Sequence, residues 1–426
     1  MRRTAFSFLF VLALVGFGAQ TAHAEIGTVD AVPAATLLLP YFEVDLDSAD
    51  GITTLFSVNN SSATAILAHV TLWTDLSVPT LDFNVYLTGY DVQTFNVRDI
   101  FNGIMQQTAS AGQDPGDLIS PKGDFSQDIN FASCNGQLPL PPLPAVLLDH
   151  IRAAHTGQGS PVVFGGLCSG VDHGDNIARG YITIDTVNNC TLDFPGDTGY
   201  FIAGGQGSAT NQNALLGDYF YVNPGENFAQ GETMLHLEAS IALGAGNYTF
   251  YRKFSGGGDQ REGLDNLFFA RFADGGAFDG GTSLVVWRDS KRVILPFSCA
   301  LPFPAPFQLS QNQIVIFDEQ EHPDIPESSP FSPAIPGDSL IPFPWEANRV
   351  QVGGPDFPVP FNFGWLYLNL NSAVVGSLVP FEPLMQNYVT VIMDANDRFS
   401  VGFDAFQLSN VTFPGEAGDV FIGGGL

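Results

Sequence analysis

Hydrophobic and polar residues alternate along much of the chain with the period of two that is typical of β-strands. In residues 65–77 the alternation places one apolar face on Ile66, Ala68, Val70, Leu72 and Leu76. The pattern repeats through residues 81–87 and, after a Thr-Gly-Tyr-Asp turn, continues at Phe95 and Val97. Several such segments separated by turn residues are typical of an antiparallel sandwich or barrel.

Further strands are expected at residues 51–59, 179–186, 218–222, 233–240, 248–254, 282–288, 313–317, 364–370, 388–393 and 399–406. Together they predict an all-β, mainly antiparallel protein. We expect two immunoglobulin-like or jelly-roll-like β-sandwich domains, an N-terminal one at residues 25–255 and a C-terminal one at residues 256–426.

Few helices are expected, the main one in a small disulfide-closed insertion at about residues 102–170. Residues 144–155 fit one best, because Pro144 suits a first turn, apolar residues follow at helical spacing and Gly157 can cap the end. A shorter helix is expected at residues 98–107. Residues 322–360 are rich in proline, which forbids central strands there, and we expect them to form an ordered cover over buried phenylalanines.

The first 24 residues have the pattern of a secretory signal peptide. Arg2 and Arg3 precede an apolar run, and Ala22-His23-Ala24 supplies a cleavage site. We therefore expect a protein secreted, or held in the periplasm or at the cell surface, with its four cysteines in two disulfides. Three pairings are possible, and we favour Cys134–Cys168 with Cys190–Cys299, the first of which would close the helical insertion.

The chain carries 15 basic and 44 acidic residues, a formal net charge of −29. Such a chain repels phosphate backbones, so nucleic acid is not an expected partner, and no apolar stretch after the signal is long enough to span a bilayer. Residues 25–97 contain no Lys or Arg but nine acids. The sequence allows three interpretations of these acids. They are solvated at the surface, or the basic region 252–292 docks against them, or calcium binds Asp45, Asp47 and Asp50 before Gly51.

Candidate binding residues lie on the polar faces of the predicted strands. Trp73 and Tyr86 are expected to be exposed there, where aromatic rings can stack on sugars or pack against another protein; burial under a second sheet or the proline-rich cover is the alternative. Calcium is the one cofactor candidate.

Catalytic signals are weak. Asp197-Thr198-Gly199 lacks the second copy that an aspartic protease needs, and is expected to be a turn. His236 with Glu238, the loop Asp172-His173-Gly174-Asp175 and the acidic stretch 318–327 could each bind a cation or orient a base, but each fits a surface segment as well. No nucleophile motif accompanies them, so no catalytic or cofactor-binding residue is assigned.

The stretch TLFSVNNSSATAILAHVTLWTDLSVPTLDFNVYLTGYDVQTFNV resembles the immunoglobulin-like sandwich modules of secreted bacterial proteins. This resemblance implies fold and export only. We expect an exported, non-enzymatic protein with a structural, adhesive or ligand-binding role, whose partners are proteins or carbohydrates at the cell surface. The alternative is a secreted carbohydrate-active hydrolase with a carboxylate pair, because such pairs are set by three-dimensional distance rather than by sequence.

Overall fold

The computed structural model describes residues 31–106, 132–159, 161–166, 169–243, 249–289, 308–324, 340–371 and 386–407. Its N-terminal half contains nine strands: β1 Thr36–Asp45, β2 Thr53–Asn60, β3 Ile66–Thr74, β4 Pro79–Leu87, β5 Val92–Asn96, β6 Ile177–Val187, β7 Leu215–Asn223, β8 Phe228–Thr233 and β9 Leu235–Leu237. They form a five-stranded sheet, β4-β3-β6-β1-β9, and a four-stranded sheet, β5-β2-β7-β8.

The C-terminal half repeats this division into five and four strands. Its strands are β10 Leu267–Ala273, β11 Gly281–Arg288, β12 Gln313–Asp318, β13 Pro323–Asp324, β14 Ala347–Val352, β15 Phe363–Asn369, β16 Asn387–Asp394, β17 Ser400–Asp404 and β18 Phe406–Gln407. The sheets run β13-β12-β15-β10-β18 and β14-β11-β16-β17. Every strand pair in the four sheets is antiparallel, which confirms the predicted fold class.

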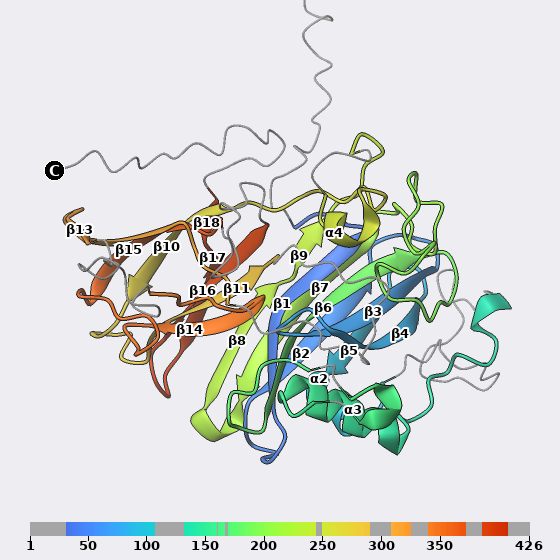
Figure 1. The fold of residues 1–426 in the computed structure, drawn as a ribbon, viewed down its shortest axis with the longest axis horizontal. Coiled ribbons are helices and arrows are strands. Elements are labelled where there is room, and N and C mark those ends of the chain that lie inside the picture. Colours follow the sequence, from blue (N-terminus) through green and yellow to red (C-terminus); the bar gives the residue numbers. More distant parts are fainter. Residues whose placement is uncertain are drawn as a thin grey trace, which may run out of the picture.

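The sheet β14-β11-β16-β17 belongs to two cores at once. Val285 and Trp287 of β11 join the core of the N-terminal half, whereas Leu284 and Val286 join the core of the C-terminal half. Because successive side chains of a strand point to opposite faces, one sheet can seal both cores. The two halves therefore share a layer, and β11 and β14 lie against β1 in the middle of the molecule (Figure 1).

Helices are short and few among the described residues: α2 Val97–Phe101, α3 Ala145–His155 and α4 Arg252–Ser255, with 3₁₀ turns η2 Ala132–Cys134, η3 Val162–Phe164 and η4 Pro224–Glu226. The expected helix after Pro144 is confirmed as α3, the longest of them. It lies with α2 beside the N-terminal sheets (Figure 1). No helix among these residues is long and apolar enough to cross a membrane.

One predicted strand is wrong. Residues 248–254 were expected to be extended, but the described part of this segment turns into α4. The cause is Asp259, whose carboxylate accepts hydrogen bonds from the Thr249 hydroxyl, the Tyr251 N–H and the Ser255 hydroxyl. These three donors gather the segment around one side chain.

Two edge strands lie within or beside the proline-rich stretch. β14 and β13 each occupy the edge of a sheet, where the loss of a backbone N–H to proline does not interrupt a ladder. The prediction that no central strand occurs there therefore holds for the described part of residues 322–360.

Candidate functional site

A groove of about 1250 Å³ lies where the N-terminal half meets β14. Its polar lining includes Tyr41 and Glu43 of β1, Arg179 of β6 and Arg349 of β14, with His173 and Trp345 from loops. Glu43 and Arg179 are directly opposite each other on neighbouring strands. Pro342, Pro344, Pro355 and Pro358 form stiff parts of the rim.

The centre of the groove is an ion pair between the two halves. An Nη atom of Arg349 contacts a carboxylate oxygen of Glu43, and the Tyr41 hydroxyl donates to the other oxygen at 3.4 Å. The Arg349 guanidinium also lies 5.7 Å from the ring centre of Tyr221 and 5.6 Å from that of Phe228. Burial alone would lower the pKa of Arg349, but Glu43, Tyr41 and Tyr221 together outweigh it and raise the pKa.

A second polar pair, His173 with Asp75, borders the same groove. The Asp75 carboxylate is almost fully buried, accepts the Val171 N–H at 3.0 Å and lies 3.0 Å from His173 Nε2. An oxygen acceptor at Nε2 means that this nitrogen carries hydrogen, so Nδ1 of the neutral ring has a free lone pair. The sequence pointed to a carboxylate near His173, but the one that orients it is 98 residues away.

Arg179 completes the polar lining. Its two Nη atoms donate to the two oxygens of Asp175 at 2.7 and 2.8 Å, a bidentate pair that lowers the pKa of Asp175. The lining thus combines donors from the two arginines with acceptors from Glu43 and the neutral form of His173. Such a lining suits groups that both donate and accept hydrogen bonds.

The predicted exposure of Trp73 and Tyr86 is wrong. Trp73 is completely buried, stacks on Tyr181 and donates its indole N–H to the Thr183 hydroxyl at 2.8 Å. Tyr86 is 1% exposed and packs beside Cys134 and Cys190. The alternation was correct, but loops and the second sheet cover the polar face as well, so all of β3 is buried.

The favoured disulfide pairing is also wrong, because Cys134 bonds to Cys190. The two Cα atoms lie 5.1 Å apart, and Ser133 accepts the Cys190 N–H beside the bond. The bridge thus ties the segment before α3 to the loop after β6, and does not close the helical insertion on itself. Cys168 and Cys299 lie outside the described residues.

Asp45, Asp47 and Asp50 form a hydrogen-bonded turn. One Asp45 oxygen accepts the N–H groups of Asp47 and Ser48, and Asp47 accepts from Asn176. In the part of the chain that the structure describes, no three His, Cys, Asp or Glu side chains are placed to hold a metal ion. The geometry therefore does not bring the predicted calcium ligands together.

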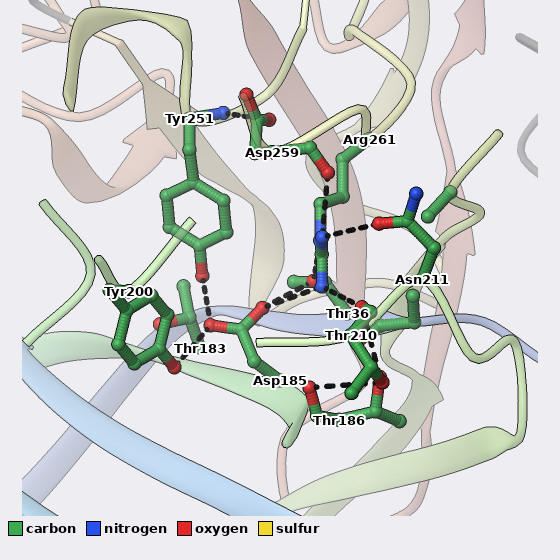
Figure 2. Close-up of polar contacts among 12 residues, drawn as sticks. Thr36, Thr183, Asp185, Thr186, Tyr200, Thr210, Asn211, Tyr251, Asp259 and Arg261 are labelled. Atoms are coloured by element: carbon green, nitrogen blue, oxygen red, sulfur yellow. Dashed lines mark hydrogen bonds and ion pairs between the residues drawn. The ribbon is translucent and has the colours of Figure 1, made fainter. Parts of the chain in front are cut away.

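The basic region 252–292 does reach the cation-free segment, although among the described residues it forms no ion pair with that segment's acids. Arg261 is fully buried and donates to the Thr36 hydroxyl at 2.8 Å, while its charge partner is Asp185 of β6, 3.8 Å away (Figure 2). Thr36, Tyr200 and Tyr251 donate to the same carboxylate. Burial raises the pKa of Asp185, and Arg261 and the three hydroxyls act against that shift.

The members of this network are buried and bonded to one another, so we assign it to the fold. Arg261 also donates to the carbonyls of Asp259 and Thr210 (Figure 2). It therefore joins β1, β6 and two long loops. Of the nine acids in the cation-free segment, Glu43 is paired with Arg349, which lies outside the predicted basic region.

The remaining sequence candidates have local roles. The Asp197 carboxylate accepts the Phe194 N–H, which makes Asp-Thr-Gly a turn as expected. His236 is buried and accepts the Gly217 N–H. Asp318 accepts from Gln320 and His322 within its own loop.

Sequence reasoning missed Arg349 and Trp345 as groove residues, and Asp75 as the partner of His173. Their strands and loops were partly foreseen, but only the packing of the two halves brings them together. No family model, curated protein or solved structure matches this chain.

Proposed function

We propose that this is an exported, non-enzymatic β-sandwich protein that binds a polyhydroxylated, carbohydrate-like ligand in the groove between β1, β6 and β14. The observation that carries the proposal is the presence of donors and acceptors together in the lining of the groove, with the half-buried Trp345. A sugar hydroxyl both donates and accepts, and a sugar ring offers a C–H face to an aromatic ring. The signal-like first 24 residues support export.

The charge of the groove favours a neutral ligand. Arg349 is paired with Glu43, and Arg179 with Asp175, so neither guanidinium offers an uncompensated positive charge. A polyanion would also approach a chain whose net charge is −29. An uncharged glycan needs no unpaired cation in the groove and is not repelled by the negative chain.

The test is calorimetric titration with cellohexaose, xylohexaose, maltohexaose, laminarihexaose and chitohexaose. We expect one of these to bind, and expect Trp345→Ala to weaken that binding about tenfold, the order of an aromatic contact. Trp365→Ala is the matched control, since Trp365 is equally half-buried but lies on β15 outside the groove. If no oligosaccharide binds, or if both variants bind like the wild type, the proposal fails.

A carbohydrate hydrolase is the second candidate, because two carboxylates, Glu43 and Asp356, line the same groove. The ion pair with Arg349 argues against Glu43 as a general acid, which needs apolar surroundings to keep its proton. Chromatography of the incubated oligosaccharides separates the two functions. If the wild type forms shortened products and Glu43→Gln does not, the protein is a hydrolase rather than a binding protein.

A further inference from the structure

A histidine and an aspartate face each other inside the N-terminal half, away from the groove. His69 of β3 is completely buried, and its Nε2 atom lies 3.5 Å from Oδ2 of Asp82 on β4. Neither of these two atoms has a hydrogen-bond partner among the described residues. Buried polar atoms are rarely left in this state, so the pair needs an explanation.

The neighbouring Asn84 determines where the hydrogen of the His69 ring lies. Asn84 Nδ2 donates to the Thr191 carbonyl at 2.8 Å, and Asn84 Oδ1 accepts the Thr191 N–H at 3.2 Å. These two contacts fix the orientation of the amide. Since Oδ1 can only accept, His69 Nδ1, 3.1 Å away, must be the donor.

It follows that Nε2 of the neutral ring carries a lone pair aimed at Asp82. An ionised Asp82 would place a second acceptor opposite the first, with no hydrogen between them. One proton resolves this conflict, either on the ring or on the carboxyl group. Burial raises the pKa of Asp82 to about 7, helped by Asp193 and Asp197, while burial lowers the pKa of His69 to about 4. Both shifts place the proton on Asp82.

The charged surroundings agree with this assignment. Asp193 and Asp197 face Asp82 from the loop after β6, and the Tyr200 ring lies 5.7 Å from the His69 ring. Within the described residues no Lys or Arg contacts Asp82. The Asp193 carbonyl and Asn84 favour a charged ring, but burial outweighs them.

We propose that Asp82 and His69 form a buried proton-sharing pair, a carboxylic acid facing a neutral imidazole, that keeps the loop of residues 188–200 closed over the sheet in mildly acidic solution. The loop is attached at this place by the Cys134–Cys190 disulfide and by the two Thr191 contacts to Asn84. An uncharged pair beneath it adds no third negative charge to Asp193 and Asp197.

The pair also removes the pH dependence of folding at this site, because the folded and unfolded chains hold the same number of protons there. Between about pH 4 and pH 6.5 the unfolded chain holds one proton on His69, because a free histidine has a pKa near 6.5. The folded chain holds one proton as well, but on Asp82. Folding then neither takes up nor releases a proton at this site. For an exported protein, which meets unbuffered surroundings, such compensation keeps the site intact over a range of external pH.

The test is spectroscopic and uses the whole protein at about pH 5.5. The infrared carbonyl band of a protonated carboxylic acid should be present in the wild type and lose one component in Asp82→Asn. It should be unchanged in Asp149→Asn, a control at an exposed position of α3. Nitrogen NMR of ¹⁵N-labelled histidine should show His69 neutral, with its hydrogen on Nδ1.

Each of these measurements can contradict the proposal. A charged His69 ring, or an infrared difference that shows an ionised Asp82 at this pH, would overturn the proposal. Hydrogen exchange of residues 188–200 gives the third readout. Asp82→Asn, whose amide can donate to Nε2 as the acid does, should speed exchange at this pH by no more than about tenfold, the effect of the proton that His69 takes up on opening one pH unit below its free pKa, whereas a larger loss of protection contradicts the role of an uncharged donor.

Discussion

Removing one member of the Asp82–His69 pair should expose a pH dependence that the pair itself conceals. Asp82→Asn leaves a buried His69 with a lowered pKa. His69→Asn leaves Asp82, whose side chain is 13% exposed, with a raised pKa, while the new amide at position 69 can still donate to Asn84. The two variants should therefore depend on pH with opposite signs.

The expected changes in the free energy of unfolding follow from the pKa values of the two groups. In Asp82→Asn the unfolded chain binds a proton between about pH 6.5 and about pH 4 that the folded chain does not. The free energy of unfolding should fall as pH falls through this window, by about 1.4 kcal/mol per pH unit and about 3 kcal/mol in total. In His69→Asn the folded chain holds the extra proton between pH 3.8 and about pH 7. Stability is then greatest in acid and falls by up to about 4 kcal/mol as pH rises through that window.

The assay is urea unfolding of each variant at half-unit intervals from about pH 4 to about pH 7.5, compared with the wild type at the same pH. Differences from the wild type remove the contribution of all other titrating groups. The double variant lacks both residues, and its difference should be independent of pH. If either single variant gives a curve parallel to the wild type, or if both slopes have the same sign, the shared-proton reasoning is refuted.

Three further predictions concern the fold. Reduction, or replacement by alanine, of Cys134 and Cys190 should lower the free energy of unfolding by about 4 kcal/mol, the loop entropy for a separation of 56 residues; an unchanged urea midpoint would contradict the bridge. Arg261→Met should cost about 3–5 kcal/mol, because it strands the buried Asp185 charge, and adding Asp185→Asn should recover part of that loss rather than deepen it. Arg288→Met should cost about 3 kcal/mol or more at every salt concentration, since it leaves several buried carbonyl oxygens without a donor; a loss that sodium chloride abolishes would show a surface charge effect instead.

Alternation in the sequence was a sound guide to strands that have one apolar and one polar face. β3, β4 and β11 were found in this way. β1 was missed because its residues are buried on both faces, so TLLLPYFEVD reads as an apolar run rather than as an alternation. Its proline coincides with an irregular register between Leu39 and Phe42, a site where strands tolerate this residue.

The polar face of the same strands could not be interpreted from the sequence. A residue that alternates with leucine and valine looks exposed whether water or a loop covers it. His69, Trp73 and Asp82 therefore resembled surface residues, and only the path of the loop after β6 shows that they are enclosed. The predicted disulfide pairing was wrong for the same reason, since four cysteines allow three pairings and the packing of distant segments selects among them.

Arginine usage connects the composition of the chain with its architecture. Several of the few basic residues bind backbone carbonyl groups rather than acids. Arg98 donates to the carbonyls of Gly51 and Ile52, and Arg288, fully buried, donates to those of Phe343, Ser310 and Leu370.

Arg288 thereby connects three segments of the C-terminal half, and Arg98 fixes the start of α2 against the residues before β2, because the guanidinium presents five donors in a fixed plane. A buried contact of this kind is not screened by salt as a surface ion pair is. The surface acids can then remain solvated. An excess of negative charge is compatible with this fold because its buried arginines stabilise it through backbone carbonyl groups. Carboxylate partners occur in the groove, where Arg349 pairs with Glu43 and Arg179 with Asp175, and at the exposed surface, where Arg398 pairs with Asp279.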